Sequence, residues 1–281
     1  MLKIRSTHHW TEPLALTRPY RIANRTIGDV KNHFVRLEAN NGLAGYGAAC
    51  PGESVTGEYL ADCEAALNQH LEANLKGTDL GRFPALTRQL RNILAATPAA
   101  LAAVDMALYD LAGKALDSPL VEILGRRHTS LPTSVTLGIQ SPDQALAEAR
   151  EFIGQGFTIL KIKIGESLDQ DIALLRGLRE VVGPSIGLRV DANQGYSLNE
   201  LNAFYKQTLN LNLELIEQPL KADQVEQMRE LPQALRSACA GDESLRTPRD
   251  ALACSHPPQP FGIYNIKLMK CGGITSALQM A

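Results

Sequence analysis

The sequence predicts an α/β protein in which an N-terminal α+β domain, residues 1–125, precedes a TIM-like (β/α) barrel domain, residues 126–281. Polar residues follow short apolar runs at intervals of about 25 to 28 residues, which is the length of one strand, one helix and two short loops. No such rhythm precedes them. Because barrel strands end at one mouth, these side chains are expected to share a pocket. They are Lys161, Lys163, Asp191, Glu217, Asp242 and Lys267.

The first domain is expected to open with an antiparallel meander of three strands. Asn40-Asn41-Gly42 is a hairpin-turn signal between the second and third of them. Apolar residues at helical spacing follow, and the second helix is rich in alanine and apolar almost all round, so it should be deeply buried. The predicted strands are 1–12, 30–39 and 43–49, and the predicted helices are 59–75 and 98–116.

From about Leu131, short apolar runs alternate with helix-like segments, which predicts a parallel sheet. Three of the helices have sound starts, at Ser141-Pro142, at Ser197 with Glu200, and at Thr247-Pro248. The predicted strands are 134–139, 158–164, 186–190, 213–216, 238–241 and 263–268, and a last helix covers 274–280. A closed barrel of this kind has eight strands, so about six are expected to leave the barrel incomplete at its C-terminus.

Composition limits the class of partner. The formal net charge is −2, with no basic run to bind nucleic acid or an anionic membrane. No stretch approaches the ~18 apolar residues of a membrane span, and the N-terminus has no targeting pattern. We therefore expect a cytoplasmic protein with a small-molecule substrate and without a nucleic-acid or membrane partner. Assembly into a homo-oligomer stays open.

The three acids among these six polar residues point to a metal. Asp191, Glu217 and Asp242 follow consecutive predicted strands, and three carboxylates brought together without a cation would raise one another's pKa. Oxygen ligands without Cys or His favour a hard ion, so Mg²⁺ fits better than zinc. The alternative for each acid is that it caps the helix that follows.

The lysines point to proton transfer. Strand alternation places Lys161 and Lys163 on one face of their strand. Lys267 would lie across the mouth from them, although Lys270 is close enough that register alone does not decide which one points inward. Two bases on opposite sides of one carbon are what a 1,1-proton transfer requires, with a metal and a lysine stabilising the enediolate.

The chain resembles the enolase superfamily, in its muconate-lactonizing subgroup, and most of all its dipeptide epimerases, typified by L-Ala-D/L-Glu epimerase. The resemblance covers nearly the whole chain. It rests on Thr17-Arg18-Pro19-Tyr20, Asn24-Arg25-Thr26, Ala103-Val104-Asp105, Leu160-Lys161-Ile162-Lys163, Asp191-Ala192-Asn193, Glu217-Gln218-Pro219, Asp242-Glu243-Ser244 and Lys267-Leu268-Met269-Lys270-Cys271-Gly272-Gly273.

This resemblance implies roles for individual residues. Asp191, Glu217 and Asp242 would bind Mg²⁺, Lys163 and Lys267 would be the opposed acid/base pair, and Lys161 would stabilise the enolate. The N-terminal domain would be a capping domain. Arg25, on a loop of that domain, and Thr136, on the first barrel strand, would contact the substrate, a dipeptide or N-acyl amino acid.

Other activities stay open. The same six polar residues would serve an o-succinylbenzoate synthase, an N-acylamino acid racemase or a cycloisomerase. Dipeptide epimerases hold the substrate's α-amino group with two aspartates on the eighth barrel strand, and the 281 residues reach only a sixth. An inactive, truncated fragment is therefore a further alternative.

Overall fold

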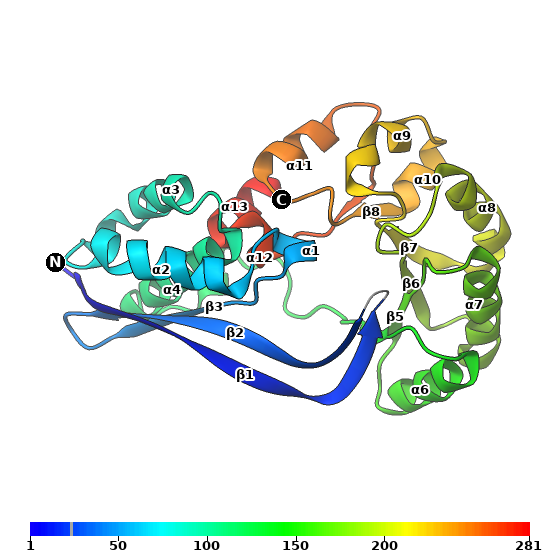
Figure 1. The fold of residues 1–281 in the computed structure, drawn as a ribbon, viewed down its shortest axis with the longest axis horizontal. Helices are drawn as coiled ribbons and strands as arrows, with labels where there is room; N and C mark the ends of the chain where they lie inside the picture. The colour runs from blue at the N-terminus through cyan, green and yellow to red at the C-terminus, as the bar shows by residue number, and fades with distance from the viewer. Residues whose placement is uncertain (23–24) are drawn as a thin grey trace.

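An antiparallel sheet with strand order β1-β2-β3 forms one side of the N-terminal half in the computed structural model, which describes residues 1–22 and 25–281 (Figure 1). The predicted turn is present: Gly42 has a φ of 89°, and the Ala39 N–H donates to the Leu43 carbonyl oxygen at 2.8 Å. The strands are β1 (Ile4–Ile22), β2 (Arg25–Ala39) and β3 (Ala44–Ala49).

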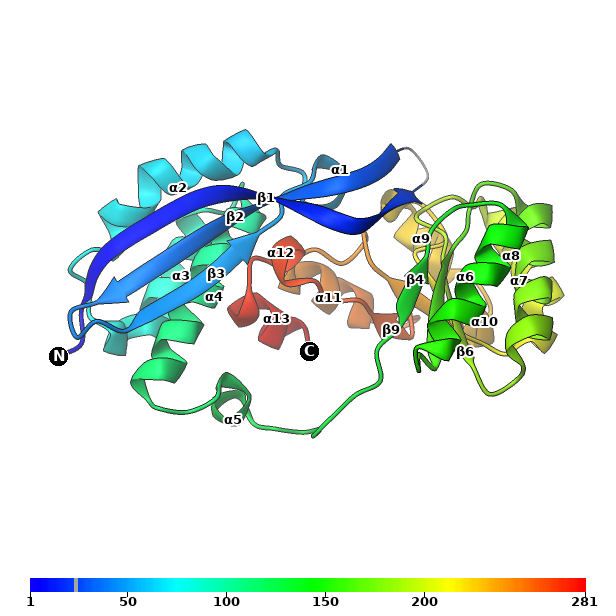
Figure 2. The ribbon, with the colours of Figure 1, turned by 90° about the horizontal axis from the view of Figure 1, so that it is seen from below.

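The first two strands are longer than predicted. Beyond the sheet they continue as a two-stranded ribbon that reaches over to the C-terminal half (Figures 1 and 2). Pro13, the first residue beyond the predicted strand, pairs with Lys31 within this ribbon. Strand β1 is an edge strand, where proline is tolerated because its missing N–H costs no ladder bond on the open side.

Helix α4 lies against the sheet and is buried almost all round, as the sequence predicted. The contact with β3 is close: a Cβ at Gly47 would lie 1.9 Å from the carbonyl oxygen of Ala103, so only glycine fits there. The helices of this half are α1 (Glu53–Thr56), α2 (Leu60–Leu75), α3 (Phe83–Ile93), α4 (Pro98–Ala115) and α5 (Leu120–Leu124), with a 3₁₀ turn at Leu80–Arg82.

Glu58, between α1 and α2, is a buried carboxyl with 2% of its surface exposed. Its Oε1 accepts a hydrogen bond from the backbone N–H of Ala99 in the first turn of α4, at 2.5 Å. Its Oε2 has no hydrogen-bond partner among the described residues. Burial raises the pKa of Glu58 to about 7, against the opposing effect of the Ala99 hydrogen bond.

We expect Glu58→Gln to stabilise the protein at pH 8 and to have little effect at pH 5. Between pH 4.5 and 7 the folded state holds a proton on Glu58 that the unfolded state has released, so wild-type stability falls as pH rises through this window. At about 1.4 kcal/mol per pKa unit, the gain at pH 8 is about 3.5 kcal/mol. Urea unfolding at both pH values measures it, with exposed Glu180→Gln as control. Equal gains at pH 5 and 8 would contradict the assignment.

A six-stranded parallel sheet forms the C-terminal half, with strand order β4-β5-β6-β7-β8-β9. All six strands were predicted, but the sixth is shorter. It ends at Tyr264, and Lys267, expected on this strand, is the extended N-cap residue of a short helix. The strands are β4 (Val135–Leu137), β5 (Ile159–Lys163), β6 (Gly187–Asp191), β7 (Leu213–Glu217), β8 (Cys239–Gly241) and β9 (Ile263–Tyr264).

Helices connect these strands, and the three predicted starts are confirmed as capping boxes at Ser141, Ser197 and Thr247. The helices are α6 (Pro142–Gly154), α7 (Leu168–Val182), α8 (Leu198–Thr208), α9 (Val225–Arg229), α10 (Gln233–Ala238), α11 (Pro248–Ser255), α12 (Leu268–Cys271) and α13 (Ile274–Met280). Two 3₁₀ turns lie at Leu209–Leu211 and Ala222–Gln224.

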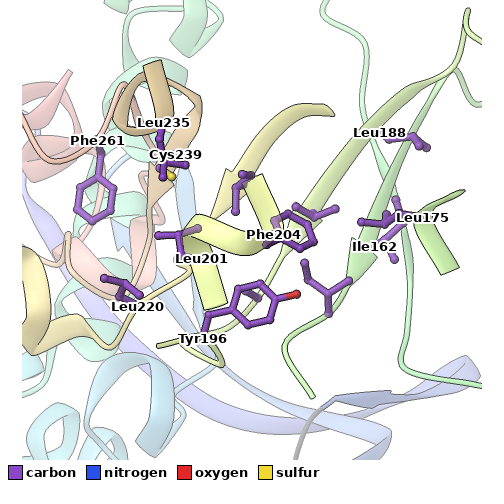
Figure 3. Close-up of a cluster of buried hydrophobic side chains, with 14 of the residues drawn as sticks. Ile162, Leu175, Leu188, Tyr196, Leu201, Phe204, Leu220, Leu235, Cys239 and Phe261 are labelled. Atoms are coloured by element: carbon purple, nitrogen blue, oxygen red, sulfur yellow. The ribbon is translucent and has the colours of Figure 1, made fainter. Parts of the chain in front are cut away.

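The core of this half lies between the sheet and its helices. Ile162 and Leu188 from the strands meet Leu175 from α7 and Phe204 from α8, all at most 1% exposed (Figure 3). A separate core fills the N-terminal half between its sheet and α2, α3 and α4. One face of β5 therefore packs in this core. The side chains on the other face, which point away from α7, are available to form a site.

The described sheet is open, with β4 and β9 as its edges. Helices α12 and α13 lie between the two halves, against α4 (Figures 1 and 2). Asp105 of α4 accepts hydrogen bonds from the Thr275 N–H at 3.0 Å and the Thr275 hydroxyl at 2.6 Å, at the start of α13. In the described ranges, no helix is both long enough and apolar enough to cross a membrane.

Candidate active site

Three acids lie at the carboxyl ends of neighbouring strands. Asp191 ends β6 and Glu217 ends β7, and the two are register partners in the sheet. Asp242 directly follows β8, the next strand. All three side chains are buried. The sheet register therefore places the three acids at one edge of the sheet, as expected from the sequence.

Two lysines stand on β5, beside the first acid strand. Lys161 and Lys163 share one face of the strand, while Leu160, Ile162 and Ile164 on the other face are buried in the core. Nζ of Lys163 donates to Asp191 Oδ2 and to Asn193 Oδ1, both at 2.7 Å. This alternation confirms the shared face that was predicted from the sequence.

Nζ of Lys161 bridges two acids. It lies 2.6 Å from Glu217 Oε2 and 2.9 Å from Asp191 Oδ2. One cationic nitrogen therefore already stands between two of the three carboxylates. A set of buried carboxylate oxygens that converges on a cation fits a hard divalent ion in type and charge.

The pKa values follow this charge arrangement. Burial raises the pKa of Asp191, but the ammonium groups of Lys163 and Lys161 outweigh it and hold the pKa below its usual range. Asp242 follows the same logic, with Lys267 and Lys270 as the cations that lower its pKa. Burial lowers the pKa of Lys161, but Asp191 and Glu217 raise it to a greater extent. The site is therefore a network of ion pairs.

Two lysines contact Asp242, and they differ in the exposed fraction of their side chains. Nζ of Lys267 lies 2.5 Å from Asp242 Oδ2, and 35% of the Lys267 side chain is exposed. Lys270 contacts Asp242 Oδ1, and 0% of its side chain is exposed. On the question that sequence register left open, the structure shows that Lys267 is partly exposed to solvent and Lys270 is fully buried.

The strand order places lysines on both sides of the three acids. The sheet runs β5-β6-β7-β8-β9, so the lysines on β5 stand at one side of the three acid strands. Lys267, just beyond β9, stands at the other side. A small molecule bound over the acids would have a lysine on each flank.

Sequence reasoning left three supporting amides without a role. Asn193 binds Lys163, and Asn265 donates its side-chain N–H to Glu217 Oε1 at 2.8 Å. Buried Gln218 accepts hydrogen bonds at Oε1 from the backbone N–H groups of Asp242 and Ser244, at 2.8 and 3.1 Å. Asn193 and Gln218 also have positive φ values, 43° and 36°. All three amides lie within two residues of the carboxyl end of a strand, which was the available signal.

The three carboxylates are not arranged around one common metal position. In the part of the chain that the structure describes, no three His, Cys, Asp or Glu side chains are gathered closely enough to hold one ion. Lysine nitrogens separate the carboxylates instead. The acids fit a metal by their chemistry and burial, and binding one would require the ammonium groups to turn away from them.

The two predicted substrate contacts have different outcomes. Thr136 on β4 is the register partner of Lys161, and its side chain is exposed on the same face of the sheet. Arg25 begins β2, at the end of the ribbon that reaches over to the C-terminal half, and its side chain is outside the described part of the structure.

Family models match most of the chain. Residues 5–125 match the N-terminal domain of mandelate racemase/muconate lactonizing enzymes, and residues 144–281 match the enolase C-terminal domain-like family. The L-Lys-D/L-Arg epimerase of Desulforapulum autotrophicum is 52% identical over 280 residues, which are 100% of this chain and 79% of that protein. The chain belongs to the mandelate racemase/muconate lactonizing enzyme family of the enolase superfamily.

Solved structures of the family have the same fold. A dipeptide epimerase from Methylococcus capsulatus, in complex with Mg and the dipeptide L-Arg-D-Lys, superposes with a TM-score of 0.96 at 47% identity, over 99% of this chain and 78% of that one. The L-Ala-D/L-Glu epimerase of Bacillus subtilis superposes with a TM-score of 0.94 at 32% identity, over the same shares. Close relatives in the family are epimerases and racemases, and the chain is an isomerase.

Proposed function

We propose that this chain is a Mg²⁺-dependent dipeptide epimerase that inverts the carbon next to the substrate carboxylate. The observation that carries the proposal is the flanking of three buried acids by Lys163 on one side and Lys267 on the other. A single base could remove a proton from one face of the carbon only. Inversion needs a second base on the opposite face.

The reaction balances with these two lysines. One lysine, as a neutral amine, takes the proton from the α-carbon and becomes an ammonium. The pair of electrons left behind moves toward the carboxylate carbon and forms an enediolate. The opposite lysine, as an ammonium, then gives its proton to the other face of the carbon and becomes the neutral amine. In the reverse direction the lysines exchange roles.

The remaining charges serve the enediolate. Asp191, Glu217 and Asp242 would hold Mg²⁺, which when bound supplies positive charge to the substrate carboxylate. Lys161, between Asp191 and Glu217, adds a fixed positive charge on the same face as Lys163. Both would favour the enediolate over the substrate because loss of the α-proton adds a second negative charge to the carboxylate oxygens.

Two classes of dipeptide are candidates. The sequence motifs favour a substrate like L-Ala-L-Glu, while identities of 52% and 47% to L-Lys-D/L-Arg epimerases favour a dipeptide with basic side chains. Thr136, beside Lys161, is a proposed contact for either, as is Arg25. We expect a basic dipeptide such as L-Lys-L-Arg to give the higher kcat/KM. An N-acyl arginine in the same panel tests the racemase alternative.

Solvent exchange tests the function itself. In D₂O with Mg²⁺, deuterium is expected to enter the α-carbon of the C-terminal residue while the opposite epimer accumulates, as followed by proton NMR and chiral chromatography. Chelation of the metal is expected to stop both. Absence of exchange with every dipeptide of the panel would contradict the proposal, and elimination without epimer formation would favour an activity like that of o-succinylbenzoate synthase.

A further inference from the structure

We propose that Lys270 is a positioning residue that holds Asp242 in place and keeps its charge balanced, so that Lys267 is free to serve the substrate. This inference depends on the proposed function, because it assigns Asp242 to the metal and Lys267 to proton transfer. The site as described above uses Lys161, Lys163 and Lys267 and leaves Lys270 without a task.

The contacts of Lys270 use all of its donors. An ammonium has three N–H bonds, and Nζ of Lys270 has three oxygen partners: Oδ1 of Asp242, the backbone oxygen of Asp242, and the backbone oxygen of Asn265 at 3.2 Å. The three acceptors fix the nitrogen from three directions. No part of its side chain is exposed, so Lys270 cannot reach a substrate.

Asp242 therefore has one permanent and one replaceable partner. Its Oδ1 faces the buried Lys270, and its Oδ2 faces Lys267, whose side chain is open to solvent. If Lys267 turned to a substrate with no other cation present, Asp242 would be a buried unpaired charge, which is strongly unfavourable. Lys270 removes that penalty, since Asp242 keeps a cationic partner when Lys267 moves.

Lys270 also links the hydrogen bonds that orient Asp242 and Glu217. The carbonyl of Asn265 accepts from Lys270, while the side-chain amide of Asn265 holds Glu217. Through Asn265, the orientation of Asp242 is linked to that of Glu217. Both carboxylates are thus oriented from the β9 side of the site, leaving their other oxygens for a metal or a lysine.

The segment that carries Lys270 is fixed from the N-terminal half. Helix α12 ends in Gly272 and Gly273, with φ values of 84° and 107°. A Cβ on Gly272 would lie 2.6 Å from Leu101, and one on Gly273 would lie 2.5 Å from Oδ2 of Asp105, so α4 packs directly on this turn. The backbone oxygen of Lys267 accepts from the Lys270 N–H at 3.0 Å. The backbone of both lysines is therefore held in one turn, and of their two side chains only that of Lys267 is exposed and able to turn away from Asp242.

The test compares Lys270→Met with the wild type, with exposed Lys206→Met on α8 as a matched control. We expect Lys270→Met to weaken Mg²⁺ affinity about 10- to 100-fold, as loss of outer-shell support typically does, and to lower kcat by a similar factor with a smaller change in KM. Isothermal titration calorimetry measures the affinity. Deuterium exchange should continue from both epimers at a reduced rate, because Lys163 and Lys267 remain.

Two results would overturn the inference. Loss of exchange from one epimer alone would make Lys270 an acid/base residue, and unchanged Mg²⁺ affinity and kcat with a lowered Tm would make its role structural only. If Lys270→Met fails to fold, Lys270→Gln, which keeps two N–H donors without the charge, takes the same measurements with the same two contrary outcomes. Failure of the proposed function is distinct, because the wild type would then show no Mg²⁺-dependent exchange.

Discussion

Replacing Lys267 by alanine is expected to abolish epimerisation in both directions, with a loss in kcat/KM of about 100- to 10,000-fold. Each inversion needs a proton removed from one face and another delivered to the opposite face, and in the proposed mechanism Lys267 serves one of these faces. Deuterium exchange is expected to persist for the epimer whose α-proton faces Lys163. Proton NMR in D₂O, starting from each pure epimer in turn, measures both effects.

The Lys267→Ala fold should survive, because Asp242 keeps Lys270 as its partner. Lys163→Ala gives the mirror result, with exchange retained only from the other epimer. Lys206→Ala, on the exposed side of α8, is the control and should leave both rates unchanged. Epimerisation by Lys267→Ala at more than a tenth of the wild-type rate would exclude the two-lysine mechanism.

Glu217→Gln is expected to remove Mg²⁺ binding and, with it, activity. Glu217 is the central of the three acids, and its loss removes a charged ligand while Lys161 stays in place between Asp191 and the new amide. The wild type should gain about 2.7 kcal/mol of stability at Mg²⁺ concentrations 100 times the Kd, by mass action. The variant should gain almost none. Thermal melts across a Mg²⁺ titration measure the difference.

Glu214→Gln provides a matched control for this substitution. Glu214 lies on the same strand, β7, but near its start, three residues before Glu217, and its ion-pair partner is Arg189. Its variant should bind Mg²⁺ and turn over substrate like the wild type. A full Mg²⁺-dependent shift in Tm for Glu217→Gln would remove Glu217 from the ligand set.

Periodicity predicted the C-terminal half well because each strand there is a separate apolar run between capped helices. The run at Ile159–Lys163 became β5, and the capping boxes at Ser141, Ser197 and Thr247 start helices as expected. Prediction was wrong where tertiary contacts override local pattern. The sixth run stops being a strand at Tyr264, because α12 turns there to pack against α4.

The N-terminal ribbon shows the opposite error. Its residues beyond Glu12 include prolines and polar side chains that locally indicate a loop, and they remain in strands because β1 and β2 bond to each other. Cross-strand hydrogen bonds are non-local, so a single-strand pattern cannot report them. The short helices α1 and α5 and the longer helix α3 were missed as well.

In the site, the acids and the pair on β5 could be predicted because strand ends and strand faces follow from spacing alone. The partners of each group could not. Three hydrogen bonds join residues that are 24 to 48 positions apart in the sequence: Asn265 to Glu217, the Asp242 N–H to Gln218, and Lys270 to Asp242. Only the sheet register brings such residues within hydrogen-bonding distance.

The sequence by itself predicted which residues would carry the proposed chemistry: three acids and three lysines at or near the ends of neighbouring strands, on a parallel sheet. The tertiary structure decided which partner each of these residues has and which lysine is exposed. Lys267 and Lys270 are alike in sequence, three residues apart beside the same acid, and burial alone makes one open to solvent and the other sealed. That difference arises because α4 of the N-terminal half packs on the turn that carries both, and packing between segments distant in the chain leaves no trace in local spacing.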